Sequence, residues 1–349
     1  MVCIAAFIIL AIIGVFVAII SIFKPEVGKK YLKIFKKSWG CLWKKVRLQK
    51  CETGFKEDVK NTLLSRVIVK HPKWVKPLSA IIEVISVVIV IVAVWAILTA
   101  IKSLLALWAL GTCNVTKPAA CSLGAEVCSI DEEEPTNFIE GVGRWFTEWG
   151  EIFEAIPDKF KNYQAGDYDF TYISVADGSE EKSIAVDILD PGCIVCLKSY
   201  NNQREAGFFE NYNVRIVPYA IQAPDGTYKY KNSALVVKYM LAVEQIRSGT
   251  AVKLLDYIFT RKNHNDISYQ TLFNEDYSED DARGKLETWL GELGFDDGAI
   301  EEVRKIADYP EIEEKMESNQ DIVENQIHAK GIPTMIFDGK KHTGLWKAE

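Results

Sequence analysis

The stretch Ala185-Val186-Asp187-Ile188-Leu189-Asp190-Pro191-Gly192-Cys193-Ile194-Val195-Cys196 decides the fold of the largest part of this chain. The apolar run 183–189 is typical of a buried strand, and the residues Asp-Pro-Gly end it. Residues 197–209 can form a helix, so the two cysteines stand where a strand ends and a helix begins. A helix N-terminus offers free N–H groups and partial positive charge, which stabilise a thiolate. The pattern therefore predicts a reactive dithiol.

A single C-x-x-C has other interpretations, namely half of a zinc site or a structural bridge. No second C-x-x-C or C-x-x-H exists in the sequence, which disfavours zinc, and we predict no metal and no cofactor. Asp187 lies six residues before Cys193 inside the apolar run. Burial raises the pKa of a carboxyl group, and such an acid can accept and return the proton of the second thiol. The alternative is an outward-facing residue on an edge strand.

A second informative stretch is Gly331-Ile332-Pro333-Thr334-Met335-Ile336-Phe337, followed by Asp338-Gly339. Proline at the head of an apolar strand is unusual, and an X-Pro peptide is where a cis bond is expected. Asp-Gly suits a hairpin turn into residues 342–346. The sequence thus predicts a proline-headed strand that is paired with the last strand of the chain.

Asp187, the Cys193–Cys196 motif and residues 331–334 together resemble the thioredoxin superfamily over about residues 168–346. The resemblance implies that Cys193 is the exposed nucleophile and Cys196 the buried resolving cysteine. It also implies that Asp187 is the buried acid.

The same resemblance implies a substrate-binding loop at residues 332–334. Pro333 would shape the substrate-binding face and keep metals away, and Thr334 follows it in the loop. Ile332 would offer backbone hydrogen bonds to a substrate strand.

The long interval between Cys196 and Pro333 points to one branch of that superfamily. Much of the interval has helical periodicity, over the stretches 234–246, 251–259, 278–293 and 298–307. A helical insertion of this kind resembles DsbA-like extracytoplasmic oxidases. The dipeptide Ile194-Val195 departs from the pattern of that branch, so the direction of electron flow stays open.

Two apolar runs and a charge asymmetry predict a membrane anchor. Residues 2–23 and 84–101 carry no charge, and roughly 20 apolar residues cross a bilayer as a helix. A cleaved signal peptide at 2–23 and a buried soluble helix at 84–101 are the alternatives. Residues 24–76 hold 16 Lys/Arg against 4 Asp/Glu, whereas residues 111–349 hold 24 against 43. Because short basic loops stay in the cytoplasm, both termini and the acidic part are expected outside it.

These observations predict an α/β thioredoxin-like domain with a helical insertion, plus two transmembrane helices. The outer segment includes an amphipathic helix at 138–160, expected to pack on the following domain, with membrane insertion as the alternative. The predicted segments are transmembrane helix 1 (1–23), a basic cytoplasmic loop (24–77), transmembrane helix 2 (78–110), a cysteine-containing linker with the amphipathic helix (111–167) and the thioredoxin-like domain (168–349, insertion about 233–325).

Four further cysteines are predicted to lie outside the cytoplasm, where thiols tend to be oxidised. We expect the pairings Cys121–Cys128 and Cys3–Cys113, although four cysteines allow three pairings and sequence does not choose among them. The competing hypothesis makes one of them a relay thiol between Cys193 and a membrane partner. A link from Cys121 or Cys128 to Cys193 would favour the relay.

The predicted function is thiol–disulfide exchange on exported cysteine-containing proteins, foremost disulfide formation. Reductase or isomerase activity on the same scaffold is one alternative. A redox-inactive thioredoxin-like binding or scaffold module is another. The resemblance implies a membrane redox partner similar to DsbB or VKOR, and the apolar runs imply contact with membrane lipid. The charge pattern points to a membrane boundary and not to nucleic acid.

Overall fold

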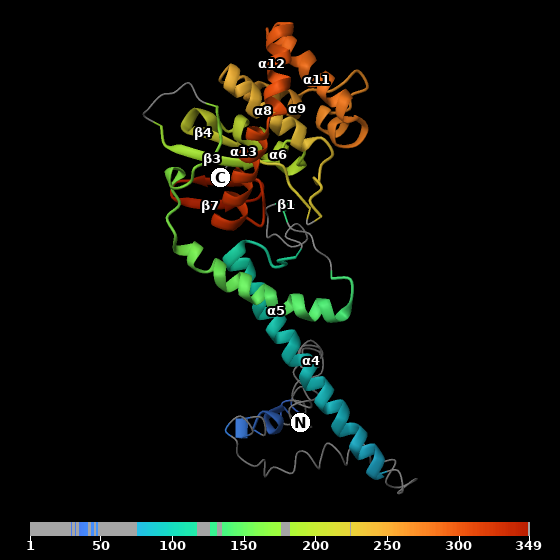
Figure 1. The fold of residues 1–349 in the computed structure, drawn as a ribbon. Helices are drawn as coiled ribbons and strands as arrows, with labels where there is room; N and C mark the ends of the chain where they lie inside the picture. Colours follow the sequence, from blue (N-terminus) through green and yellow to red (C-terminus); the bar gives the residue numbers. More distant parts are fainter. Residues whose placement is uncertain are drawn as a thin grey trace. The chain divides into compact units, whose positions relative to one another are not determined.

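The computed structural model describes residues 75–116, 126–130, 135–175, 182–223 and 225–347, with short stretches between 29 and 47. The chain forms two compact units, residues 1–101 and residues 102–349 (Figure 1). The predicted first span at 1–23 lies outside the described residues, as does most of the basic loop. The second unit carries both sequence motifs that predict the dithiol site.

One long apolar helix, α4, covers the predicted second span. It runs from Val75 to Leu110 over 36 residues. Its residues 76–110 include a window of mean hydropathy 3.0 and are long and apolar enough to cross a membrane. One span of the two that the sequence predicts is therefore visible as a helix among the described residues.

A mixed sheet forms the centre of the second unit. Its strand order is β2-β4-β3-β6-β7, and the central β3 is parallel to β4 and antiparallel to β6. Asp187 lies in the middle of β3, beside Ile216 of β4 and Met335 of β6. The strands span Ile173–Ser174 (β2), Ile184–Leu189 (β3), Asn213–Pro218 (β4), Thr334–Phe337 (β6) and Lys340–Thr343 (β7).

The two sequence motifs form the predicted connections of this sheet. Helix α6 (Ile194–Glu205) begins directly after Cys193, and the short α7 spans Phe208–Asn211. Asp338 and Gly339 have φ values of 48° and 76°, and they join β6 to β7 in the predicted hairpin. The edge strand β2 contributes only two residues to the sheet.

Six helices lie between β4 and the proline-headed strand within the described residues, and the four periodic stretches are all helical. Helix α13 was not predicted, because its exposed faces are polar and only Ile312, Met316 and Asn319 are buried. Trp289 of α11 is fully buried and packs against the rings of Tyr269 and Phe273. The helices are α8 (Ser233–Ile246), α9 (Thr250–Thr260), α10 (Tyr269–Thr271), α11 (Glu279–Glu292), α12 (Asp297–Ala307) and α13 (Pro310–Asp321), with π-helical turns η5 (Leu272–Asp276) and η6 (Ile322–Gln326).

The predicted amphipathic helix is α5 (Phe138–Ala155), followed by the 3-10 turns η3 (Pro157–Phe160) and η4 (Ala165–Asp167). The sequence predicts that this helix packs on the sheet domain. Instead, its buried apolar residues pack mainly against the end of α4. Glu148 of α5 forms a buried ion pair with Lys102 of α4. Five large apolar side chains in this region stay exposed: Phe138, Ile139, Phe146, Phe153 and Phe160.

A two-stranded ribbon completes the unit. Strand β1 (Cys128–Ser129) pairs antiparallel with β5 (Gly331–Ile332), which directly precedes Pro333. The Ile332–Pro333 peptide is cis, as the sequence predicts. The ribbon brings a segment from the region before the sheet domain against the dithiol loop (Figure 1).

Candidate active site

Cys193 occupies the N-cap position of α6, so the dithiol stands at a helix start as predicted. Its Sγ accepts a hydrogen bond from the backbone N–H of Cys196 at 3.4 Å. A donor at this place stabilises negative charge on sulfur. Cys196 lies one turn inside α6, carries a free thiol and is fully buried.

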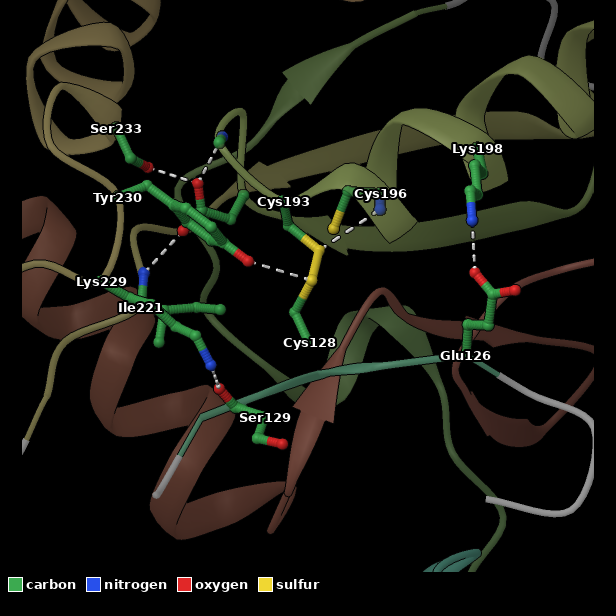
Figure 2. Close-up of a disulfide and its surroundings, with 12 residues drawn as sticks. Glu126, Cys128, Ser129, Cys193, Cys196, Lys198, Ile221, Lys229, Tyr230 and Ser233 are labelled. Carbon is green, nitrogen blue, oxygen red and sulfur yellow. Dashed lines mark hydrogen bonds and ion pairs between the residues drawn. A yellow bond between two sulfur atoms is a disulfide. The ribbon is translucent and has the colours of Figure 1, made fainter. Parts of the chain in front are cut away.

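Cys193 is bonded to Cys128, not to Cys196 (Figure 2). The predicted pairing Cys121–Cys128 is therefore wrong for this structure. The reason is the β1–β5 ribbon, which brings Cys128 to a Cα–Cα distance of 6.4 Å from Cys193. Cys113 is also disulfide-bonded. The expected pair Cys3–Cys113 stays untested, because Cys3 and Cys121 lie outside the described residues.

The dithiol is closed off from solvent. The sequence predicts an exposed Cys193, whereas here its exposed fraction is 0%. The cover includes β1, because Cys128 and Ser129 lie against the dithiol loop and are themselves buried. The structure thus holds Cys193 in a covalent link with a cysteine from elsewhere in the chain.

The predicted buried acid is confirmed as buried. Asp187 is 1% exposed, and this burial raises its pKa to about 6, although a hydrogen bond from Gln203 Nε2 to Oδ2 at 3.0 Å opposes the shift. Its other oxygen, Oδ1, has no hydrogen-bond partner within the part of the chain that the structure describes. A carboxyl group with a free oxygen and a pKa near neutrality can take up and return a proton.

The thiol of Cys196 is held in its neutral form. Burial raises its pKa well above the ordinary value, and the negative charges of Asp190 and Asp187 raise it further. A hydrogen bond from the backbone of Asp190 acts in the opposite direction. Both acids are therefore close enough to influence this thiol, and a base must assist its deprotonation.

Asp190 is a second buried acid, whose place in the sequence indicates only the end of a strand. Its Oδ1 accepts from Gly192 N at 2.7 Å and from the hydroxyl of Ser233, and its Oδ2 accepts from Ile221 N at 2.8 Å. Burial raises its pKa to about 6. Since both oxygens are occupied, Asp190 orders the loop before the dithiol.

Side chains of the helical insertion hold the same loop in place. Gln270 donates from Nε2 to the carbonyl oxygens of Pro191 and Cys193 at 2.8 and 3.1 Å. Asn274 donates to the carbonyl of Gly192 at 2.8 Å. These residues carry no motif, and only the fold could reveal them.

The proline-headed loop lies beside the disulfide. Ile332 is fully buried and is the register partner of Cys128. Thr334 is also buried, and its hydroxyl donates to the carbonyl of Gly331 at 2.7 Å, so its side chain braces the loop. The carbonyl of Pro333 accepts from Gly344 N at 2.8 Å. Among the described residues no group of three or more His, Cys, Asp or Glu side chains could hold a metal ion.

Comparison with known proteins gives fold-level likeness alone. No family profile and no curated protein matches the chain. A thiol-disulfide oxidoreductase from Corynebacterium diphtheriae, MdbA, superposes with a TM-score of 0.36 at 15% identity, covering 51% of this chain and 92% of its own. The thiol-disulfide exchange protein alpha-DsbA2 from Wolbachia pipientis gives 0.35 at 18% identity, covering 59% and 92%. A thioredoxin-like oxidoreductase from Silicibacter pomeroyi gives 0.36 at 14% identity, covering 50% and 85%.

The class of the second unit follows from its own architecture. The strand order β2-β4-β3-β6-β7 and a dithiol at the start of α6 define a thioredoxin-like α/β domain with a helical insertion. The added feature is a third cysteine, Cys128, in covalent contact with the dithiol.

Proposed function

We propose that this chain is a membrane-anchored thiol–disulfide oxidoreductase that forms disulfides in exported proteins. The observation that carries the proposal is the Cys193–Cys128 disulfide beside the free thiol of Cys196. In that arrangement Cys193 holds a cysteine of an extended strand, which is the geometry of a mixed disulfide in exchange.

The chemistry of oxidation assigns a role to each residue. A substrate thiolate attacks Sγ of Cys193 in a Cys193–Cys196 disulfide, and Cys196 leaves and takes a proton, for which Asp187 is the nearby carrier. A second substrate thiolate then attacks the substrate sulfur of the mixed disulfide and releases Cys193 as a thiolate. The substrate loses two thiol hydrogens and gains a disulfide, and the protein disulfide is reduced to two thiols.

The direction is supported by the environment of Cys193. A thiolate stabilised at a helix start favours the reduced protein, and a stabilised reduced form makes the disulfide a better oxidant. A new cycle needs an external disulfide or a membrane redox partner of the kind that DsbB and VKOR represent.

The anchor is proposed from α4 and α5 together. Helix α4 meets the length and composition of a span. At its end, α5 packs by Ile152 and Ala155 and leaves Phe146 and Phe153 exposed. An exposed aromatic face beside the end of a span suits the interface of a bilayer. Together with the apolar run 2–23 and the basic loop 24–77 of the sequence, this favours a two-pass anchor with the thioredoxin-like domain outside the cytoplasm.

The test uses the full chain in detergent micelles with a reduced, unfolded protein that contains paired cysteines and a glutathione disulfide buffer. We expect catalysed loss of substrate thiols, abolished by Cys193→Ser and unchanged by Cys41→Ser, whose thiol is predicted on the cytoplasmic side. Catalysed reduction or reshuffling without net oxidation would assign reductase or isomerase activity. Absence of any thiol–disulfide exchange would instead favour the alternative of a redox-inactive binding module.

A further inference from the structure

Residues 126–130 lie along the proline-headed loop as an added strand (Figure 2). Cys128 faces Ile332 and Ser129 faces Gly331 in an antiparallel register. Ile130 N donates to the carbonyl of Lys330 at 3.3 Å, and Leu345 N donates to the carbonyl of Glu126 at 2.7 Å. The segment is therefore held by backbone hydrogen bonds at both of its ends, a mode of binding that any extended peptide can reproduce.

Side chains add contacts along the same segment. The hydroxyl of Tyr230 donates to Sγ of Cys128 at 3.3 Å, and Lys229 Nζ donates to the carbonyl of Ser129 at 3.2 Å. Glu126 forms an exposed ion pair with Lys198 at 2.6 Å. Ile130 is 3% exposed and belongs to the core of the thioredoxin-like domain. The strand is thus docked at defined positions on either side of its cysteine.

The fit at Gly331 is close. A Cβ added there would meet the carbonyl oxygen of Cys128 at 3.1 Å and Cβ of Val127 at 3.2 Å. Ser129, the residue after the cysteine, is fully buried. The groove therefore admits a small residue after the cysteine and allows the two backbones to approach closely.

We propose that residues 126–130 are a tethered substrate strand and that Cys128 is a third redox cysteine, which occupies Cys193 until a substrate replaces it. This inference rests on the proposed function, since the groove is the one assigned there to substrates. The oxidised chain then has a closed form with Cys128–Cys193 bonded and an open form with Cys193–Cys196 bonded.

The two forms interconvert without an external oxidant. The Cys196 thiolate attacks Sγ of Cys193, the Cys193–Cys196 bond forms, and the Cys193–Cys128 bond breaks. The electron pair of the broken bond stays on Cys128, which takes the proton that Cys196 lost. One disulfide and one thiol exist before and after the step, so electrons and protons balance. The high pKa of the buried Cys196 thiol slows its attack and helps the closed form to persist.

The strand also indicates which substrates fit. An acceptable segment is extended, carries a small residue after its cysteine and has an acidic residue two positions before it, opposite Lys198. With the covalent link removed by Cys128→Ser and the docked strand weakened by Ile130→Ala, we expect the peptide Glu-Val-Cys-Ser-Ile to form a mixed disulfide with Cys193, starting from the Cys193–Cys196 disulfide, several-fold faster than Lys-Val-Cys-Ser-Ile. It should also react at least tenfold faster than Glu-Val-Cys-Trp-Ile. Equal rates for the three peptides would overturn this assignment of the groove.

The decisive measurement is disulfide mapping of the full oxidised chain in micelles, after acid quenching and alkylation. We expect the Cys128–Cys193 peptide pair in the unaltered chain. Ile130→Ala removes a buried side chain of the docked strand and should shift the closed-to-open ratio toward Cys193–Cys196 by at least about tenfold. Ile139→Ala, the same change at an exposed site, should leave the ratio unaltered. Glu126→Gln, which cannot disturb the core, should shift the ratio in the same direction by a few-fold at most.

The outcomes separate this inference from the proposed function. A chain that oxidises substrates but never forms Cys128–Cys193 would overturn the tethered strand and leave the function standing. A chain that forms the link, and shifts it with Ile130→Ala, but exchanges with no substrate would support the strand and refute the function. An unchanged ratio in both Ile130→Ala and Glu126→Gln would refute the docked strand.

Discussion

Cys128 is the antiparallel register partner of Ile332, and the same residue is covalently bonded to the dithiol. One residue of β1, Cys128, therefore takes part both in the strand pairing and in the disulfide. Because β5 pairs with β1 alone among the described strands, removing β1 would leave β5 without a strand partner. Unpaired strand edges favour addition of another strand. The proposed exchange of one extended cysteine segment for another rests on this pairing.

The first prediction concerns substrate trapping. In Cys196→Ser the resolving thiol is absent, yet Cys128 can attack a mixed disulfide between Cys193 and a substrate, reform Cys128–Cys193 and release the substrate thiol. We expect few trapped substrates in Cys196→Ser and many more in Cys196→Ser combined with Cys128→Ser. Non-reducing gels of the purified chain measure this after reaction with a reduced, unfolded protein in a glutathione disulfide buffer, which supplies the oxidising disulfide to both variants. Equal trapping by both variants would show that Cys128 does not reach the mixed disulfide.

The second prediction is a pH-dependent stabilisation by Asp187→Asn. The pKa of Asp187 rises from 3.8 to about 6 on folding, so its proton is bound more tightly in the folded state. Its contribution to stability is therefore fully present below pH 3.8 and is lost as the pH rises through about 6. A shift of this size corresponds to at most about 3 kcal/mol. We expect Asp187→Asn to raise the free energy of unfolding at pH 7.5 by about 1–3 kcal/mol and to change it little at pH 4.

The measurement is urea unfolding in micelles followed by tryptophan fluorescence at the two pH values. Asp190→Asn is the contrasting variant, because three hydrogen bonds to its carboxylate would be weakened together. It should destabilise the domain at both pH values. In exchange assays Asp187→Asn should slow release of the mixed disulfide more than its formation. No change in either step would assign Asp187 a structural role.

Local patterns were sufficient for much of the domain. The apolar run around Asp187, the break at Asp190 and the helix after Cys193 predicted a strand, a turn and a helix start, because each depends on neighbours within a few residues. Asp338-Gly339 predicted the final hairpin for the same reason. These signals place Cys193 and Cys196 directly after the strand that carries Asp187.

Features that depend on contacts between residues far apart in the sequence could not be predicted in the same way. The partner of Cys193 is 65 residues away, and three pairings of the outer cysteines were equally allowed by sequence. The support of the dithiol loop by Gln270 and Asn274 depends on how the insertion packs. Helix α13 has too few apolar residues for a periodic signal. The pattern of α5 shows an apolar face but not what covers it, so the sequence predicted packing on the sheet domain, whereas its buried residues contact the end of α4.

The third prediction concerns Gly192, which packs closely against Tyr230 and Asn274. A Cβ there would lie 2.5 Å from Cβ of Tyr230 and 2.9 Å from Oδ1 of Asn274. We expect Gly192→Ala to destabilise the domain by about 1–3 kcal/mol. It should also displace Tyr230 from Cys128 and lower the fraction of the Cys128–Cys193 link. Gly291→Ala in α11 is the matched control, since a Cβ meets nothing there within 4 Å and alanine favours a helix. A Gly192→Ala chain as stable as this control would contradict the close fit.

The last prediction tests how α5 is held at the end of α4. The ion pair between Lys102 and Glu148 is buried, with side-chain exposed fractions of 9% each, and Glu148 also accepts from the Thr116 hydroxyl at 2.5 Å. Removing one member leaves the other as an unpaired buried charge, which costs about 3–5 kcal/mol, whereas replacing both by apolar residues is close to neutral. We expect Lys102→Met alone to speed hydrogen–deuterium exchange of the α5 amides by at least tenfold in micelles. Adding Glu148→Leu should restore most of the protection. Equal exchange in the single and double variants would show that this pair does not hold α5 in place.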